Sequence, residues 1–301
     1  MSGRAGTRMK KIKANFLASP LRSKPISFYT WNDQLSRIFQ QDRLLQQELK
    51  RPCILPLSGS LRQNPKVSKS YSDYLKFIQK LTNPFPPEYR DIAGISTVEP
   101  KLKYCFFPPS RSAETELIKK LYGSRPVPPD FKLIDALIKH IRKNKINLIP
   151  GEQSGWYDHQ IFALETLVVP EKTPESKKLF FHETYKQELL NLFKSAITLT
   201  RETHIKQLEI PLAGAALMPP SIDIRPGLTI EPLYSHYLRR AQSYGYIRRL
   251  LESTFGRKAL KQIFRMTADG PVSIPLYEEL GWIESLFYGA CQCTAAEIGM
   301  T

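Results

Sequence analysis

Apolar side chains recur at intervals of three and four residues in most segments of this 301-residue chain, which is the spacing of one helix face. Helices are predicted over 31–50, 71–81, 114–123, 130–145, 155–169, 174–199, 232–251, 258–266 and 276–297. Residues 222–230 instead alternate apolar and polar side chains around Pro226 and Gly227, which predicts one small β-hairpin. We therefore expect a mainly α fold, an irregular multi-helix bundle with long Pro-rich loops.

Caps and prolines set the expected helix boundaries. Ser112 is a good N-cap for the helix that ends before Gly123, and Asp130 opens the next one. Thr173 followed by Pro174 predicts a capped helix start with proline in its first turn. The 24 prolines are spread between the helical segments, so the connections are expected to be stiff loops.

The charge of the chain lies in its first half. Residues 1–150 hold 28 Lys and Arg against 11 Asp and Glu, whereas residues 151–301 hold 16 against 17. We predict a flexible basic arm over 1–28, a basic Pro-interrupted helical lobe over 29–150 and a neutral helical lobe over 151–301. A one-sided basic surface attracts polyanions, and RNA, DNA or an acidic protein is the expected partner.

Candidate polyanion contacts cluster in two places. The residues are Arg111, Lys119, Lys120, Lys139, Arg142, Lys143 and Lys145 in the first half, and Arg240 and Arg248 in the second. The second group lies in a stretch that interleaves tyrosine with arginine, a composition that suits a single-stranded nucleic acid. The alternative is structural, because lysines in the last turn of a helix offset its negative pole.

The most chemical-looking stretch, residues 154–171, reads SGWYDHQIFALETLVVPE. Its apolar spacing favours a buried helix with Ser154 as N-cap. Asp158, His159 and Glu165 are nevertheless the best catalytic cluster in the sequence. Asp158 and Glu165 lie two turns apart, about 10 Å along the axis, so another segment would have to complete a site.

A metal-binding bundle is the other alternative in the second half, with His182, Glu183, Glu202, His204 and His236 as candidate ligands. Residues 182–186, HETYK, do not complete the zinc-binding motif H-E-x-x-H, because Lys186 stands where the second histidine is needed. No glycine-rich nucleotide-binding motif occurs, so no cofactor is predicted.

Few cysteines and the lack of a long apolar run favour an intracellular protein. The cytoplasm is the expected location, and an organelle matrix is the alternative because the basic N-terminal segment resembles a transit peptide in composition. The function expected is that of a non-enzymatic interaction protein whose basic N-terminal half docks on a polyanion. The alternative is an all-α enzyme or metal-binding bundle that uses histidines and carboxylates of the second half.

Overall fold

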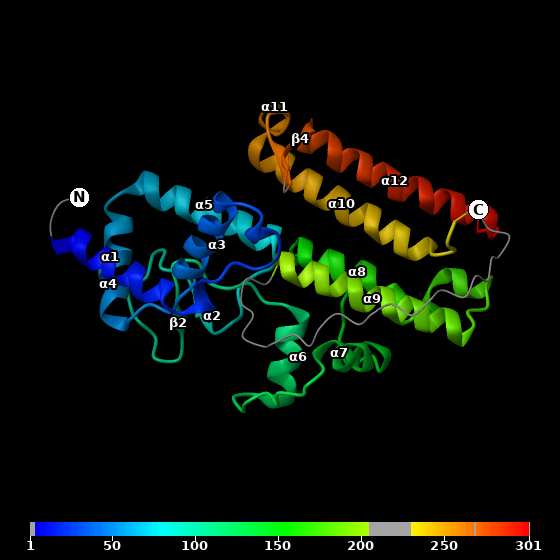
Figure 1. Ribbon diagram of the computed structural model, residues 1–301, viewed down its shortest axis with the longest axis horizontal. Coiled ribbons are helices and arrows are strands. Elements are labelled where there is room, and N and C mark those ends of the chain that lie inside the picture. The colour runs from blue at the N-terminus through cyan, green and yellow to red at the C-terminus, as the bar shows by residue number, and fades with distance from the viewer. Residues whose placement is uncertain (1–3, 205–229, 268, 301) are drawn as a thin grey trace. The chain divides into compact units, whose positions relative to one another are not determined.

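A computed structural model describes residues 4–204, 230–267 and 269–300. The described chain is mainly α, as expected, with two small two-stranded sheets (Figure 1). The hairpin predicted around Pro226 and Gly227 lies outside the described residues. The contacts divide the chain into two compact units, one built mainly from residues 1–79 and 84–111, the other mainly from 80–83, 112–201 and the described residues from 230 onward.

The first unit is built from short helices. Its elements are α1 (Arg4–Leu17), α2 (Pro20–Ser23), the 3-10 helix η1 (Ser27–Thr30), α3 (Asp33–Leu45), α4 (Arg51–Arg62), α5 (Pro65–Leu81), β1 (Tyr89–Arg90) and β2 (Lys103–Tyr104). Where the sequence predicts a flexible arm, α1 is helical and buries Phe16. Asn32 caps α3 by accepting a hydrogen bond from the Leu35 N–H. Pro52 lies in the first turn of α4, where a helix tolerates proline.

The core of the first unit is small and aromatic. Tyr71 and Leu75 of α5 pack with Ile92, and the rings of Phe106 and Phe107 lie against Tyr71. The Tyr71 hydroxyl donates a hydrogen bond to the Phe106 carbonyl, so its buried polar atom is satisfied. The loop after α5 is thereby held against the helix, and β1 and β2 pair in parallel within it.

The second unit contains the longer helices. Its elements are α6 (Ala113–Tyr122), α7 (Leu133–Arg142), α8 (Trp156–Val168), η2 (Pro170–Lys172), η3 (Pro174–Lys177), α9 (Glu183–His204), α10 (Tyr234–Phe255), α11 (Arg257–Leu260), β3 (Phe264–Thr267), β4 (Gly270–Pro275) and α12 (Leu276–Glu297). One hydrophobic core joins α6, α7, α8 and α9. Leu117, Leu137 and Ile141 pack there with Tyr157 and Phe193, so residues on both sides of position 150 share this core.

The helix α4 is missed by the sequence pattern, and several helix boundaries differ from those that the pattern predicts. Thr173 and Pro174 start only the short η3, and the long helix begins at Glu183. The helix predicted over 258–266 is the single turn α11, followed by β3, which pairs antiparallel with β4. Gly155, not Ser154, is the N-cap of α8, because the Ser154 hydroxyl donates to Asp158 Oδ2 at 2.7 Å.

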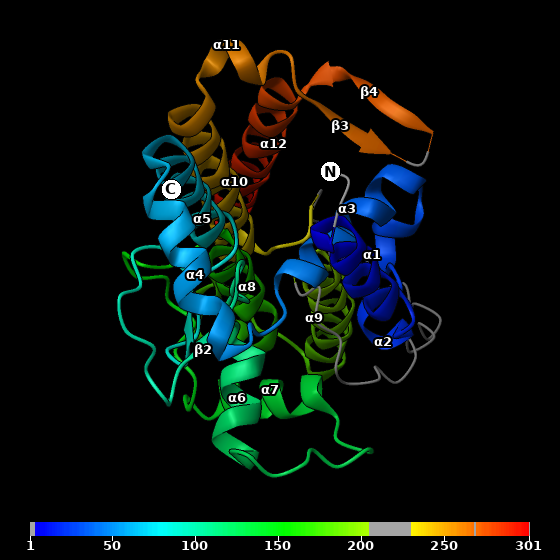
Figure 2. The same cartoon turned by 90° about the vertical axis from the view of Figure 1, so that its left-hand side faces the viewer.

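The helix α10 packs along both α8 and α12, and Figure 2 shows α10 and α12 joined at one end by α11 and the β3–β4 hairpin. Gly245 permits a close approach of α12, because a Cβ at this position would lie 2.6 Å from Glu284 Oε1. The Glu284 carboxylate can then form an ion pair at 2.8 Å with Arg248 of α10. Glycine is therefore needed here for space rather than for an unusual backbone conformation.

Candidate functional site

The end of α7 is shaped by a Schellman motif. The Asn144 N–H donates to the Ile141 carbonyl, and the Lys145 N–H donates to the His140 carbonyl. Asn144 has φ of 53°, the left-handed conformation that this motif requires and that asparagine tolerates better than most residues. The chain turns sharply at this point, so Lys143 and Lys145 are presented on either side of Asn144, and both are exposed.

Replacing Asn144 tests this turn. We expect Asn144→Gly to keep the free energy of unfolding within about 0.5 kcal/mol of wild type, because glycine adopts a positive φ without strain. Asn144→Val should lower it by about 1 to 2 kcal/mol, because a β-branched residue is disfavoured there. Urea denaturation of the full chain measures both. Equal stabilities of the two variants would contradict the assigned turn.

Three further cations lie beside this turn. Lys120 of α6 donates from Nζ to the Lys145 carbonyl at 3.4 Å, and Lys172 of η2 donates to Asn144 Oδ1 at 2.6 Å. Arg142, in the last turn of α7, donates from Nε to the Val168 carbonyl at 3.3 Å. We call Lys120, Arg142, Lys143, Lys145 and Lys172 the basic surface. All five side chains are exposed, and they come from three segments separated in sequence.

The basic surface has an electrostatic effect on its neighbourhood. The pKa of the exposed Glu183 is lowered, first by the hydrogen bond and charge of Lys186, 2.7 Å away, and further by the charge of Arg142. The C-terminal end of α7 is the negative pole of the helix dipole, and it offsets part of the positive charge of the basic surface. The arrangement can hold an anion by charge-assisted hydrogen bonds from several directions.

The other predicted polyanion contacts are placed differently. Lys119 and Lys139 are exposed on α6 and α7, next to the basic surface, whereas Arg111 belongs to the first unit. Arg248 is ion-paired to Glu284, and Arg240 donates to the Tyr244 hydroxyl and lies over its ring. Arg240 also lies over the Phe287 ring of α12, so both arginines contribute to the packing of α10 against α12.

Three residues that the sequence pattern does not single out lie in the segment before α9. Lys177 and Lys178 are exposed, and Phe180 is 82% exposed. The sequence pattern predicts one continuous amphipathic helix from residue 174. In such a helix these three residues would be ordinary helix positions, so nothing marks them as a site. The signal that could have found them is the run KKLFF at residues 177–181, because an amphipathic helix does not require two lysines followed so closely by two phenylalanines.

The stretch that carries Asp158, His159 and Glu165 forms the buried helix α8. Asp158 accepts hydrogen bonds from Asn83 Nδ2 at 2.9 Å and from the Ser154 hydroxyl. The His159 ring stacks on Tyr246 of α10 at 4.3 Å, and burial lowers the pKa of this histidine. Glu165 is 2.9 Å from Arg239 Nη1. Each of the three has its own structural partner, so the structure does not gather them around one reacting atom.

Two residues of α10 complete the polar contacts between α8 and α10. His236 is partly buried with Nδ1 3.0 Å from the Ala163 carbonyl oxygen, and this burial lowers its pKa to about 4. Arg239 lies over the Phe162 ring at 3.6 Å and also donates to the Phe162 carbonyl. The polar side chains between α8 and α10 thus fix how the two helices pack.

The candidate metal ligands whose side chains are described do not form one cluster. His182 is exposed beside Phe180, Glu183 pairs with Lys186, and His236 is partly buried against α8. Glu202 and His204 lie in the last turn of α9, and their side chains are outside the described part of the structure. Among the described residues, no three side chains of the metal-binding types come together.

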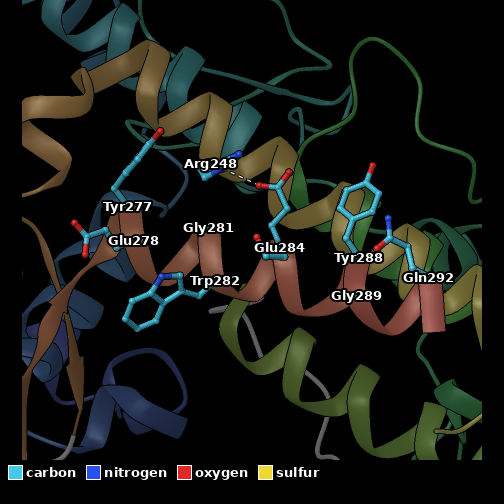
Figure 3. Close-up of a pocket in the computed structure, with 10 residues that line it drawn as sticks. Arg248, Tyr277, Glu278, Gly281, Trp282, Glu284, Tyr288, Gly289 and Gln292 are labelled. Atoms are coloured by element: carbon cyan, nitrogen blue, oxygen red, sulfur yellow. Dashed lines mark ion pairs between the residues drawn. The ribbon is translucent and has the colours of Figure 1, made fainter. Parts of the chain in front are cut away.

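A shallow hollow of about 480 Å³ lies on α12 (Figure 3). Tyr277, Trp282 and Tyr288 line it together with the Arg248–Glu284 ion pair. In Figure 3, Trp282 projects from α12 on the side away from Arg248. Arg248 and Glu284 neutralise each other, and Glu278 also lines the hollow, so the hollow combines aromatic rings with one further carboxylate.

Comparison of the chain with protein-family models, curated proteins and solved structures finds no match. No helix in the described residues is long and apolar enough to cross a membrane. The function is therefore inferred from the residues of the chain itself.

Proposed function

We propose that the protein is a non-enzymatic interaction protein that binds a polyanion through the basic surface. One observation carries this proposal. Lys120 and Lys172, from different segments, both contact the exposed turn at the end of α7. A cation that served only the helix dipole would be needed on α7 alone. Cations supplied by α6 and η2 as well favour an external anion.

The physical chemistry of such a surface is well defined. Each lysine or arginine that contacts a phosphate releases a condensed counterion, which makes binding favourable and strongly dependent on salt. The excess of cations in residues 1–150 adds long-range attraction for the same partner. RNA, DNA and an acidic protein surface all carry the required charge.

The enzyme alternative finds less support. A catalytic cluster needs groups that converge on a substrate, and Asp158, His159 and Glu165 are each engaged by a structural partner. Their contacts explain the packing of α8 without a reaction. We therefore propose binding rather than catalysis.

The test is fluorescence anisotropy with a labelled single strand of about 20 nucleotides at about 50 to 200 mM salt. We expect the triple variant Lys120→Gln, Lys143→Gln, Lys145→Gln to bind about tenfold more weakly than wild type, because three phosphate contacts are removed. These side chains are exposed, so the fold should be kept.

The matched control is Lys66→Gln, Lys69→Gln, Lys76→Gln, which removes the same charge from exposed positions of α5. We expect it to bind within twofold of wild type. Equal losses in the two triple variants would mean that net charge alone drives binding. Absence of wild-type binding at about 50 mM salt would refute the proposal.

A further inference from the structure

Phe180 stands out among the exposed apolar side chains. At 82% exposure it is the most exposed of the large apolar residues in the described chain. A single exposed phenylalanine is common on protein surfaces and proves nothing alone. Its setting is what matters, since Lys177 and Lys178 precede it and both are exposed.

The local structure holds Phe180 outward. The next residue, Phe181, is buried and its ring stacks with Tyr185 of α9 at 5.9 Å with an interplanar angle of 15°. The His182 ring meets Phe180 edge to face at 5.0 Å. Anchoring of Phe181 in the core therefore fixes the segment and presents the neighbouring ring to solvent.

The chain segment that carries this ring is linked to the basic surface at two points. Glu183, three residues after Phe180, is within electrostatic reach of Arg142. Lys172, five residues before Lys177, contacts Asn144 in the turn at the end of α7. Cations thus precede the ring in sequence and approach the same segment from α7.

An exposed aromatic ring beside several cations matches the chemistry of an unpaired nucleic acid strand. Successive phosphates require cations along the backbone, and unstacked bases require a flat apolar face. A duplex keeps its bases stacked inside, so it offers phosphates and groove edges but no open base face along its length. Three of the four tyrosines of 234–249 are already engaged, because Tyr237 and Tyr244 lie against Phe287 and Tyr246 stacks with His159.

We infer that the polyanion bound by the basic surface is a single-stranded nucleic acid and that one of its bases stacks on Phe180. This inference rests on the proposed function of the basic surface. It adds the class of ligand and a residue that contributes by stacking rather than by charge.

The experiment compares wild type, Phe180→Ala and Phe180→Trp as full chains with three labelled probes. The probes are an unstructured RNA strand, an RNA duplex of the same length and inorganic polyphosphate. We expect Phe180→Ala to weaken binding of the single strand by about tenfold or more, because a base loses its stacking partner. The duplex and polyphosphate should bind all three proteins within twofold, and Phe180→Trp should keep the single-strand affinity.

The control is Phe255→Ala, which removes an exposed phenylalanine at the end of α10 and should leave all affinities unchanged. If Phe180→Ala binds the single strand as tightly as wild type does, the inference is overturned and the proposed function of the basic surface still holds. Equal losses with all three probes would also overturn it, since polyphosphate has no bases. If wild type binds none of the probes, the proposed function itself fails.

Discussion

Glu114→Ala should lower the free energy of unfolding by about 3 to 5 kcal/mol, one of the largest effects available in this chain. Glu114 of α6 is 1% exposed and accepts a hydrogen bond from the buried Tyr157 hydroxyl. Its Oε1 lies 3.3 Å from Arg201 Nε, and the Arg201 side chain is only 8% exposed. Removing the carboxylate leaves a buried positive charge without its counterion and a buried hydroxyl without its acceptor.

Two further variants make the Glu114 prediction specific. Glu116→Ala removes an exposed carboxylate from the same turn of α6 and should cost less than about 1 kcal/mol. The triple variant Glu114→Met, Arg201→Met, Tyr157→Phe should recover most of the loss, because apolar groups of similar volume can replace a buried ion pair. Urea denaturation of the full chains gives each value. A Glu114→Ala protein as stable as Glu116→Ala would show that the buried ion pair does not form.

The second large effect concerns pH. Burial, helped by the charges of Arg240 and Arg239 and opposed by the hydrogen bond to the Ala163 carbonyl, lowers the pKa of His236 in the folded protein to about 4. The ordinary pKa of histidine in an unfolded chain is about 6.5. The unfolded chain therefore binds a proton between these values while folded His236 stays neutral. The resulting contribution to stability is complete above pH 6.5 and is lost as pH falls, by about 3 kcal/mol at pH 4.

The measurement is the free energy of unfolding of wild type and His236→Gln at a series of pH values from about 7 to about 4. The variant should be less stable than wild type near neutral pH, because it loses the packing of the ring against α8. It should also show a shallower decline below about pH 6.5. The same substitution at the exposed His182 is the control. Parallel pH profiles for wild type and His236→Gln would contradict a neutral His236 packed against α8.

Much of the fold follows from the sequence, because long helices leave a clear apolar period. The helices α6, α8, α10 and α12 occur where that period predicts them, and Ser112 caps α6 by accepting the Thr115 N–H. Boundaries depend on tertiary contacts and are predicted less well. The segment after Thr173 shows why: Glu175 turns inward to accept hydrogen bonds from the Ser235 N–H and hydroxyl, so it stabilises the start of α10 instead of continuing a helix.

The site is predicted in part. The turn after α7 is visible in the sequence as a cluster of cations at a helix end, but its neighbours Lys120 and Lys172 are distant in sequence. Glu114 shows the same limit. Its position in the first turn of α6 is explained locally by the helix dipole, and only the fold reveals that Tyr157 and Arg201 meet it.

The salt dependence of binding measures how many phosphates the basic surface neutralises. For a single strand, the slope of the logarithm of the binding constant against the logarithm of salt concentration becomes shallower by about 0.7 for each phosphate that the protein no longer neutralises. We expect a slope shallower by about 2 for Lys120→Gln, Lys143→Gln, Lys145→Gln, and an unchanged slope for the α5 control. Identical slopes for wild type and the first triple variant would contradict the claim that the basic surface holds the phosphates.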